Sequence, residues 1–80
     1  MTNTEELIRL IDEKGIKKKR ICEELGISYK LLREKVNNNK PFTAEEIQKF
    51  CKMLEISSLK QKEHVFFAIN VDKNSTKFDE

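Results

Sequence analysis

The sequence predicts an all-α protein, a compact domain of four to five helices, and three observations support this fold class. Glycine occurs twice and proline once in 80 residues, whereas Leu, Ile, Lys and Glu, which favour helices, are frequent. Apolar residues recur at helical spacing in several separate segments. Helix-capping residues or glycines stand between these segments. At this length the chain forms one domain with a modest core and little room for a deep substrate pocket.

The first two predicted helices span residues 4–14 and 17–25. In both, apolar residues line one face at a spacing of three or four positions. Each helix is followed by a glycine, Gly15 and Gly26. Glycine adopts the left-handed conformation that ends a helix at low cost. The sequence therefore predicts two short helices that are separated by tight turns.

Two further helices follow with clear start signals. Ser28 is a good N-cap for a third helix over residues 28–37, and the polar run that follows it predicts a loop. Thr43 and Glu46 form a capping box at the start of a fourth helix. Behind that box an apolar stripe at helical spacing predicts the core face, formed by Ile47, Phe50, Cys51 and Leu54.

The C-terminal part of the chain leaves two alternatives open. Apolar residues stand at every second position from 65 to 71, which suits a strand, but a short fifth helix that starts at Ser57 or Ser58 fits as well. The residues beyond are polar, which predicts a frayed end. The expected organisation is a domain over residues 1–63, an extended or helical segment over 64–72 and a frayed tail over 73–80.

The net charge of +2 conceals a basic middle third. Residues 14–40 contain nine basic and three acidic residues, a net charge of +6, whereas residues 1–13 carry −3 and residues 41–80 carry −1. Such clustering is the electrostatic footprint of a protein that binds a polyanion. A lysine-rich solvated surface has the same composition. The charge pattern alone leaves both interpretations open.

The basic segment contains the pattern of two helices that cross tightly at a turn, over about residues 17–37. Cys22 supplies a small side chain where the helices cross, and Gly26 tolerates the positive φ of the turn. Leu32 is the inward aliphatic residue of the second helix, and Ile27 can pack against it across the N-cap. This combination predicts a helix-turn-helix.

At these positions the sequence resembles the phage-repressor-like, or Cro/Xre-type, helix-turn-helix family with its lambda-repressor-like fold. The resemblance covers about residues 4–56. The sequence departs from the family at Lys18, where Gln is usual, at Asn38, where Gly is usual, and at Lys35, where an apolar residue is usual. At that last position the lysine stem or the neighbouring Val36 must supply the packing. The residues that carry the resemblance are Gly15, Lys18, Ile21, Cys22, Leu25, Gly26, Ile27, Ser28, Leu32 and Asn37.

The resemblance implies that helix 28–37 enters the major groove of double-stranded DNA and reads base edges. Arg and Lys can donate to guanine, and Glu can accept from cytosine, whereas flanking basic and amide groups contact phosphates. The same side chains also fit an ordinary solvated helix face. The residues expected to read bases are Tyr29, Lys30, Arg33 and Glu34. Those expected to contact phosphates are Lys17, Lys18, Lys19, Asn37, Asn39 and Lys40.

The segment 64–72 has two interpretations. Phe66 or Phe67 can complete the core of a domain that is poor in aromatic residues, or the segment can pair with its two-fold mate as an edge strand. We expect one phenylalanine in each role. A homodimer would place two reading helices about one DNA turn, ~34–36 Å, apart. The candidate interface residues are Val65, Phe66, Phe67 and Ile69.

Other functional classes find little support in the sequence. It contains no catalytic cluster, glycine-rich phosphate loop or CxxC pair, so we expect no enzyme activity, metal, cofactor or small-molecule ligand. Cys22 and Cys51 lie on apolar stripes and are expected to be buried free thiols. The polar N-terminus and the lack of an apolar run near ~20 residues predict a cytoplasmic protein without a membrane partner. The resemblance to phage repressors implies that this cytoplasm is that of a bacterial host.

The function that the resemblance implies is a sequence-specific DNA-binding transcriptional regulator. We expect a small phage or mobile-element Cro-like repressor that acts on an operator as a homodimer. The alternative is a helical protein-interaction module, such as an antirepressor, an antitoxin or an accessory factor, in which the basic face meets an acidic protein. Salt-dependent DNA binding separates the two.

Overall fold

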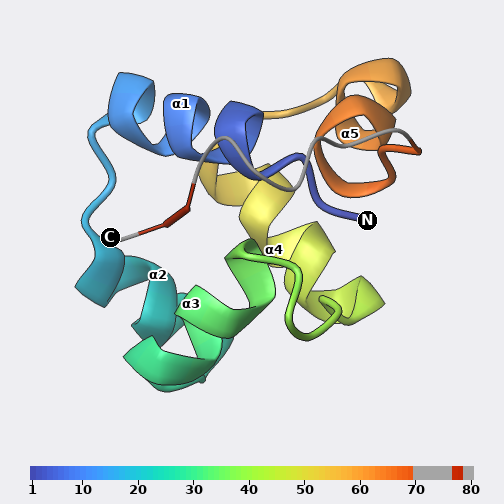
Figure 1. Cartoon of the computed structure of the whole chain (residues 1–80). Coiled ribbons are helices and arrows are strands. Elements are labelled where there is room, and N and C mark those ends of the chain that lie inside the picture. Colours follow the sequence, from blue (N-terminus) through green and yellow to red (C-terminus); the bar gives the residue numbers. More distant parts are fainter. Residues whose placement is uncertain (70–76, 79–80) are drawn as a thin grey trace.

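The structure, a computed structural model, describes residues 1–69 and 77–78. These residues contain five α-helices (Figure 1). No strand occurs in these residues. The all-α fold class is therefore confirmed, with the larger of the two expected helix numbers. The helices are α1 (Thr4–Lys14), α2 (Lys18–Leu25), α3 (Tyr29–Val36), α4 (Ala44–Met53) and α5 (Leu59–Phe66).

The helix ends follow the capping signals of the sequence. At α4 the capping box is complete, because the Thr43 hydroxyl accepts from the Glu46 N–H (3.1 Å) and the Glu46 carboxylate accepts from the Thr43 N–H (2.9 Å). Gly15 and Gly26 end α1 and α2 at φ of 66° and 69°. A Cβ at either glycine would meet no atom of the described residues within 4 Å. Glycine is therefore favoured there by backbone conformation and not by lack of space.

The core lies where the five helices converge, and α4 runs through the middle of the arrangement in Figure 1. α2 packs against α3 and α4, and α1 packs against α5. An aromatic cluster joins α5 to α4: the Phe42 ring lies 5.6 Å from Phe50 and 5.7 Å from Phe66, edge to face in both cases. The largest fully buried side chains are Phe50, Leu7, Ile21, Leu32, Leu54, Val36 and Val65.

The segment after residue 63 is helical as far as Phe66, so the strand alternative is wrong there and the expected domain boundary falls inside α5. Val65 and Phe66 are buried in the core, whereas Phe67 is 51% exposed and Ile69 is 88% exposed. Of the four candidate interface residues, Val65 and Phe66 are thus covered by the domain's own core, and Phe67 and Ile69 are exposed. Phe66 is the phenylalanine that completes the core.

Phe78 is 3% exposed, although the sequence predicts a frayed tail over 73–80. Its N–H donates to Asn37 Oδ1 (2.7 Å), and Asn37 Nδ2 donates to its carbonyl (3.3 Å). At Phe78 the structure differs from the expected frayed end, because burial of an aromatic ring offsets the cost of ordering this residue. The predicted extended segment at 70–72 and the rest of the tail, 73–76 and 79–80, lie outside the described residues.

Candidate nucleic-acid interface

α2 and α3 are joined by the tight turn that the sequence predicts. The Gly26 and Ile27 N–H groups both donate to the Cys22 carbonyl, at 2.8 and 3.1 Å, which ends α2. Two residues later the Ser28 hydroxyl accepts from the Leu31 N–H (3.1 Å) and begins α3. The side chains of Cys22 and Ile27 are half-buried against the core. The structural positions of the motif thus hold α3 firmly on α2.

α3 turns one face to the core and the other to solvent. Leu32 and Val36 are fully buried, whereas Tyr29, Lys30 and Arg33 are exposed. Glu34, the fourth expected base-reading residue, is half-buried. Its carboxylate lies 3.9 Å from the ammonium of Lys40, which comes from the loop after α3. The outer face of α3 therefore combines two cations, an aromatic hydroxyl and one carboxylate.

The start of α2 is electropositive and uncapped. Among the described residues no side chain caps this helix, since Lys17 stands at the N-cap position and the first turn contains no acid. The other helices are capped by Asn3, Ser28, Thr43 and Ser58. Lys17, Lys18 and Lys19 are all exposed. The positive end of the helix dipole and three ammonium groups together favour an anion at this place.

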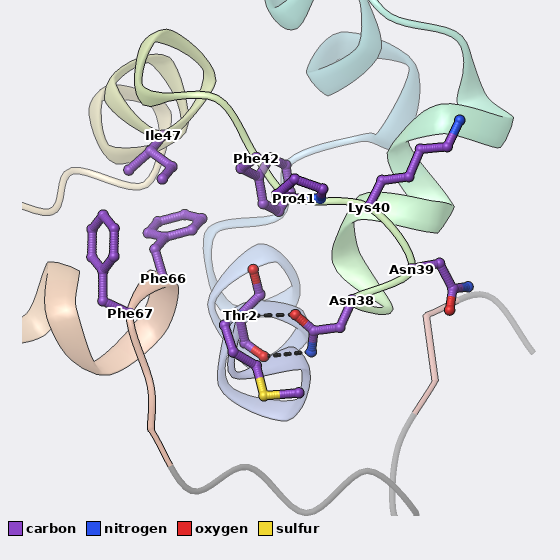
Figure 2. Close-up of a pocket in the computed structure, with 10 residues that line it drawn as sticks. Thr2, Asn38, Asn39, Lys40, Pro41, Phe42, Ile47, Phe66 and Phe67 are labelled. Carbon is purple, nitrogen blue, oxygen red and sulfur yellow. Dashed lines mark hydrogen bonds between the residues drawn. The ribbon is translucent and has the colours of Figure 1, made fainter.

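The loop after α3 is tied to the N-terminal residues (Figure 2). Asn38, at φ 66°, accepts from the Thr2 N–H and donates to the Thr2 carbonyl, both at 2.8 Å. The Asn39 and Lys40 N–H groups donate to the Glu34 carbonyl, at 2.8 and 3.3 Å. Both of these residues are exposed. The loop thus holds an amide and an ammonium beside the C-terminal end of α3.

Three of the expected DNA contacts also touch the C-terminal segment. Asn37 is half-buried and binds the backbone of Phe78 through both its amide oxygen and its amide nitrogen. The Lys18 ammonium lies 5.1 Å from the centre of the Phe78 ring and 5.9 Å from that of Tyr29. The Tyr29 and Phe78 rings are 6.5 Å apart. In the sequence, the only sign of this contact is Phe78 itself, an aromatic residue among the polar residues 72–80.

Sequence reasoning missed an ion pair behind the reading helix. Lys35 of α3 is buried and bonds through its ammonium to the carboxylate of Glu46 in α4, which is buried as well. Burial raises the pKa of Glu46, but hydrogen bonds from Lys35 and Thr43, with the charge of Lys35, outweigh it, so the pKa of Glu46 is lowered. The position that is usually apolar thus holds a lysine because α4 supplies its counter-charge.

The two cysteines are free thiols on the apolar side of the domain. Cys51 is buried and Cys22 is half-buried. Burial raises the pKa of both thiols, which keeps them protonated at neutral pH. Both cysteine side chains pack in or against the hydrophobic core.

The two crossed helices, the exposed side of α3 and the electropositive start of α2 define a helix-turn-helix DNA-binding domain. A sequence model of the Cro/C1-type helix-turn-helix DNA-binding domain family matches residues 6–59, and the chain belongs to this family. Comparisons with curated proteins and with solved structures gave no match. Within the described residues, none of the helices has the length and apolar character needed to cross a membrane.

Proposed function

We propose that the protein is a sequence-specific transcriptional regulator, a small Cro-like repressor of a phage or mobile element in a bacterial cytoplasm. The observation that supports this is the grouping of basic side chains around α3. Lys18 lies beside Tyr29 at the start of α3, and Lys40 lies beside Glu34 towards its end. A helix flanked by cations at both ends is suited to lie in the major groove between two phosphate backbones.

In this proposal α3 reads bases and its flanks position it. Lys30 and Arg33 donate to guanine, Glu34 accepts from cytosine, and Tyr29 contacts a thymine methyl or a phosphate. Phosphates are bound by Lys17, Lys18, Lys19, Asn37, Asn39 and Lys40. The uncapped N–H groups of α2 add to the phosphate site.

The salt dependence of DNA binding tests the proposal. Fluorescence anisotropy with a mixed-sequence duplex should show log K falling by about 0.9 for each phosphate contact per log unit of salt. Micromolar protein that shows no binding at low salt would contradict the proposal. That result would favour the protein-interaction module, in which the same basic face meets an acidic protein.

A pair of alanine variants tests the division between reading and positioning. An operator is first obtained by selection from random duplexes. Lys30→Ala should then weaken operator binding by about 1–3 kcal/mol and relax the sequence preference. Lys19→Ala should weaken binding to all duplexes alike and reduce the salt slope by about one. Lys60→Ala, an exposed lysine of α5, is the control with little effect. Equal losses on operator and random duplexes for both variants would refute these roles.

We further propose that two copies bind the operator as a homodimer. Phe67 and Ile69 are the exposed apolar residues at the end of α5, and Phe67 lies beside a hollow lined by Pro41, Phe42 and Ile47 (Figure 2). Light scattering should give twice the monomer mass, and Phe67→Ser with Ile69→Ser should return it to one. Leu59→Ser, an exposed apolar residue at the other end of α5, serves as the control. A monomer mass for the unchanged protein would rule out this arrangement.

A further inference from the structure

Phe78 occupies part of the surface to which we assign DNA contacts. Its ring lies against Lys18 and Tyr29, and its backbone is bound by Asn37. Lys18 and Asn37 are among the proposed phosphate contacts, and Tyr29 is the first residue of the reading helix. These residues come from α2, from the start of α3 and from the position just after α3. Phe78 therefore contacts the helix-turn-helix at the start of α2, at the start of α3 and just after α3.

Phe78 is held on the domain by burial and by hydrogen bonds. Phe78 is 3% exposed and belongs to the hydrophobic cluster of the domain. Its N–H and its carbonyl are both bonded to the side chain of one residue, Asn37. An ammonium at 5.1 Å from the ring centre is within the range of a cation–π interaction. Apolar burial, two hydrogen bonds and a cation thus hold one residue in one place.

The docked residue and DNA require the same groups. Asn37 directs its amide oxygen and one amide proton at the Phe78 backbone, so the amide edge is not turned to a phosphate. The Lys18 ammonium is held over the Phe78 ring. The Tyr29 ring has Phe78 as a neighbour on the side of Lys18. Phe78 would therefore stand between a DNA duplex and the side chains of Lys18, Tyr29 and Asn37.

We propose that Phe78 and DNA compete for this surface, so that docked Phe78 lowers the affinity of the protein for its own operator. This inference rests on the proposed DNA binding. Only the fraction of molecules with Phe78 undocked binds fully, and the apparent affinity falls in proportion to that fraction. A docking equilibrium of ten to one lowers it about tenfold. Anything that captures the C-terminal segment raises operator affinity without touching the reading helix.

Amide exchange of the unchanged protein tests the competition directly. The Phe78 N–H should be protected in the free protein, because it donates to Asn37, and should exchange freely once a saturating duplex is added. The Asn3 N–H, which donates to the Val65 carbonyl at 2.7 Å, is the matched control and should stay protected in both states. Anisotropy of the labelled duplex, recorded on the same samples, reports whether DNA is bound.

Two results of this experiment would overturn the inference. The Phe78 N–H could remain protected while anisotropy shows full binding, in which case the segment belongs to the DNA interface. It could also be unprotected in the free protein, in which case the docked state is not populated. Lack of any anisotropy change would instead refute the proposed function, and the inference with it.

The variant Phe78→Ala provides an independent readout. It should bind the operator several-fold more tightly, by about 3- to 30-fold for docking equilibria of that order, with an unchanged sequence preference. Leu59→Ala, which truncates an exposed apolar residue of α5, should leave affinity unchanged. A folded Phe78→Ala, as judged by circular dichroism, that binds more weakly than the unchanged protein would overturn the competition. If this variant does not fold, the exchange experiment on the unchanged protein decides.

Discussion

At the scale of single residues, Lys35 shows how one charged side chain is accommodated in the core. Its stem fills a buried position, and its ammonium bonds to Glu46. Glu46 in turn accepts from the Thr43 N–H and completes the capping box of α4. One carboxylate therefore neutralises a buried lysine and begins a helix at the same time. The pair ties the reading helix to the central helix of the core.

Removal of one partner of this pair should be costly. Lys35→Met keeps the volume of the stem but leaves the Glu46 carboxylate buried without its counter-charge, so we expect a loss of about 3 kcal/mol in the free energy of unfolding. Adding Glu46→Gln, which retains capping ability, should restore part of that loss. Urea denaturation of the single and double variants measures the coupling. Lys49→Met, which breaks the exposed pair of Lys49 with Glu45, should change stability by less than about 1 kcal/mol.

Glu46 should also make stability depend on pH. Its pKa in the folded protein lies below the ordinary value of 4.5. Such a carboxylate stabilises the fold fully above its unfolded pKa, and this contribution is lost as the pH falls through the folded pKa. The stability difference between the unchanged protein and Glu46→Gln should therefore be constant from pH 7 to about 5 and shrink below it. Denaturation curves at several pH values check this, with the exposed Glu45→Gln as control; a difference that does not vary with pH would contradict it.

At the scale of secondary-structure elements, α2 differs from its neighbours because its N-cap residue makes no side-chain cap hydrogen bond. Its N-cap is Lys17, in an extended conformation (φ −77°, ψ 143°) that Ser or Asp would also adopt. The lysines at its start oppose the helix dipole in the free protein and favour a phosphate in the complex. The element thus gives up helix stability at the place where an anion is expected.

Lys17→Ser should separate these two roles. A serine N-cap should stabilise the protein by about 0.5–2 kcal/mol, because its hydroxyl can accept from an N–H of the first turn, which the Lys17 side chain does not do. The same change removes a proposed phosphate contact and should weaken DNA binding. Thermal unfolding and anisotropy measure the two effects on one sample. Lys60→Ser on α5 should change neither, and a Lys17→Ser protein with unchanged stability would contradict the account of α2.

At the scale of the whole molecule, local signals predicted most of the fold and long-range contacts decided the rest. Gly15, Gly26 and the Thr43 capping box mark helix ends by rules that act within a few residues, and the structure has helix ends at those places. The Lys35–Glu46 pair and the docking of Phe78 join residues that are far apart in the chain. The alternation after residue 64 was misleading because the burial of Val65 and Phe66 against other helices decides their conformation.

The candidate site was predictable to a similar extent. The exposed face of α3 and the cations at the start of α2 follow from helical periodicity and local charge. The contact of Asn37 with Phe78 could not be predicted from the sequence, because the two residues lie 41 positions apart. Glu34 is half-buried and near Lys40 because the loop after α3 folds back on the helix. Loop geometry of this kind has no short sequence signature.

Asn38 links the helix-turn-helix to the N-terminal residues and provides a prediction for the molecule as a whole. Its φ of 66° lies in the left-handed region, which suits glycine. Asn38→Gly should nevertheless destabilise the protein, by about 1–2 kcal/mol, because both hydrogen bonds to Thr2 are lost. Chemical denaturation measures the change, and Asn39→Gly in the same exposed loop is the control. A more stable Asn38→Gly protein would show that backbone strain outweighs the two bonds.

The docking of Phe78 has a further, thermodynamic consequence. A buried aromatic side chain covers roughly 150–250 Å², and exposing it raises the heat capacity by about 0.1 kcal/mol/K. If DNA releases Phe78, this increase opposes the decrease that burial at the DNA interface produces. The enthalpy of DNA binding should then vary less steeply with temperature for the unchanged protein than for Phe78→Ala. Docking of Phe78 would in this way also flatten the temperature dependence of the enthalpy of DNA binding.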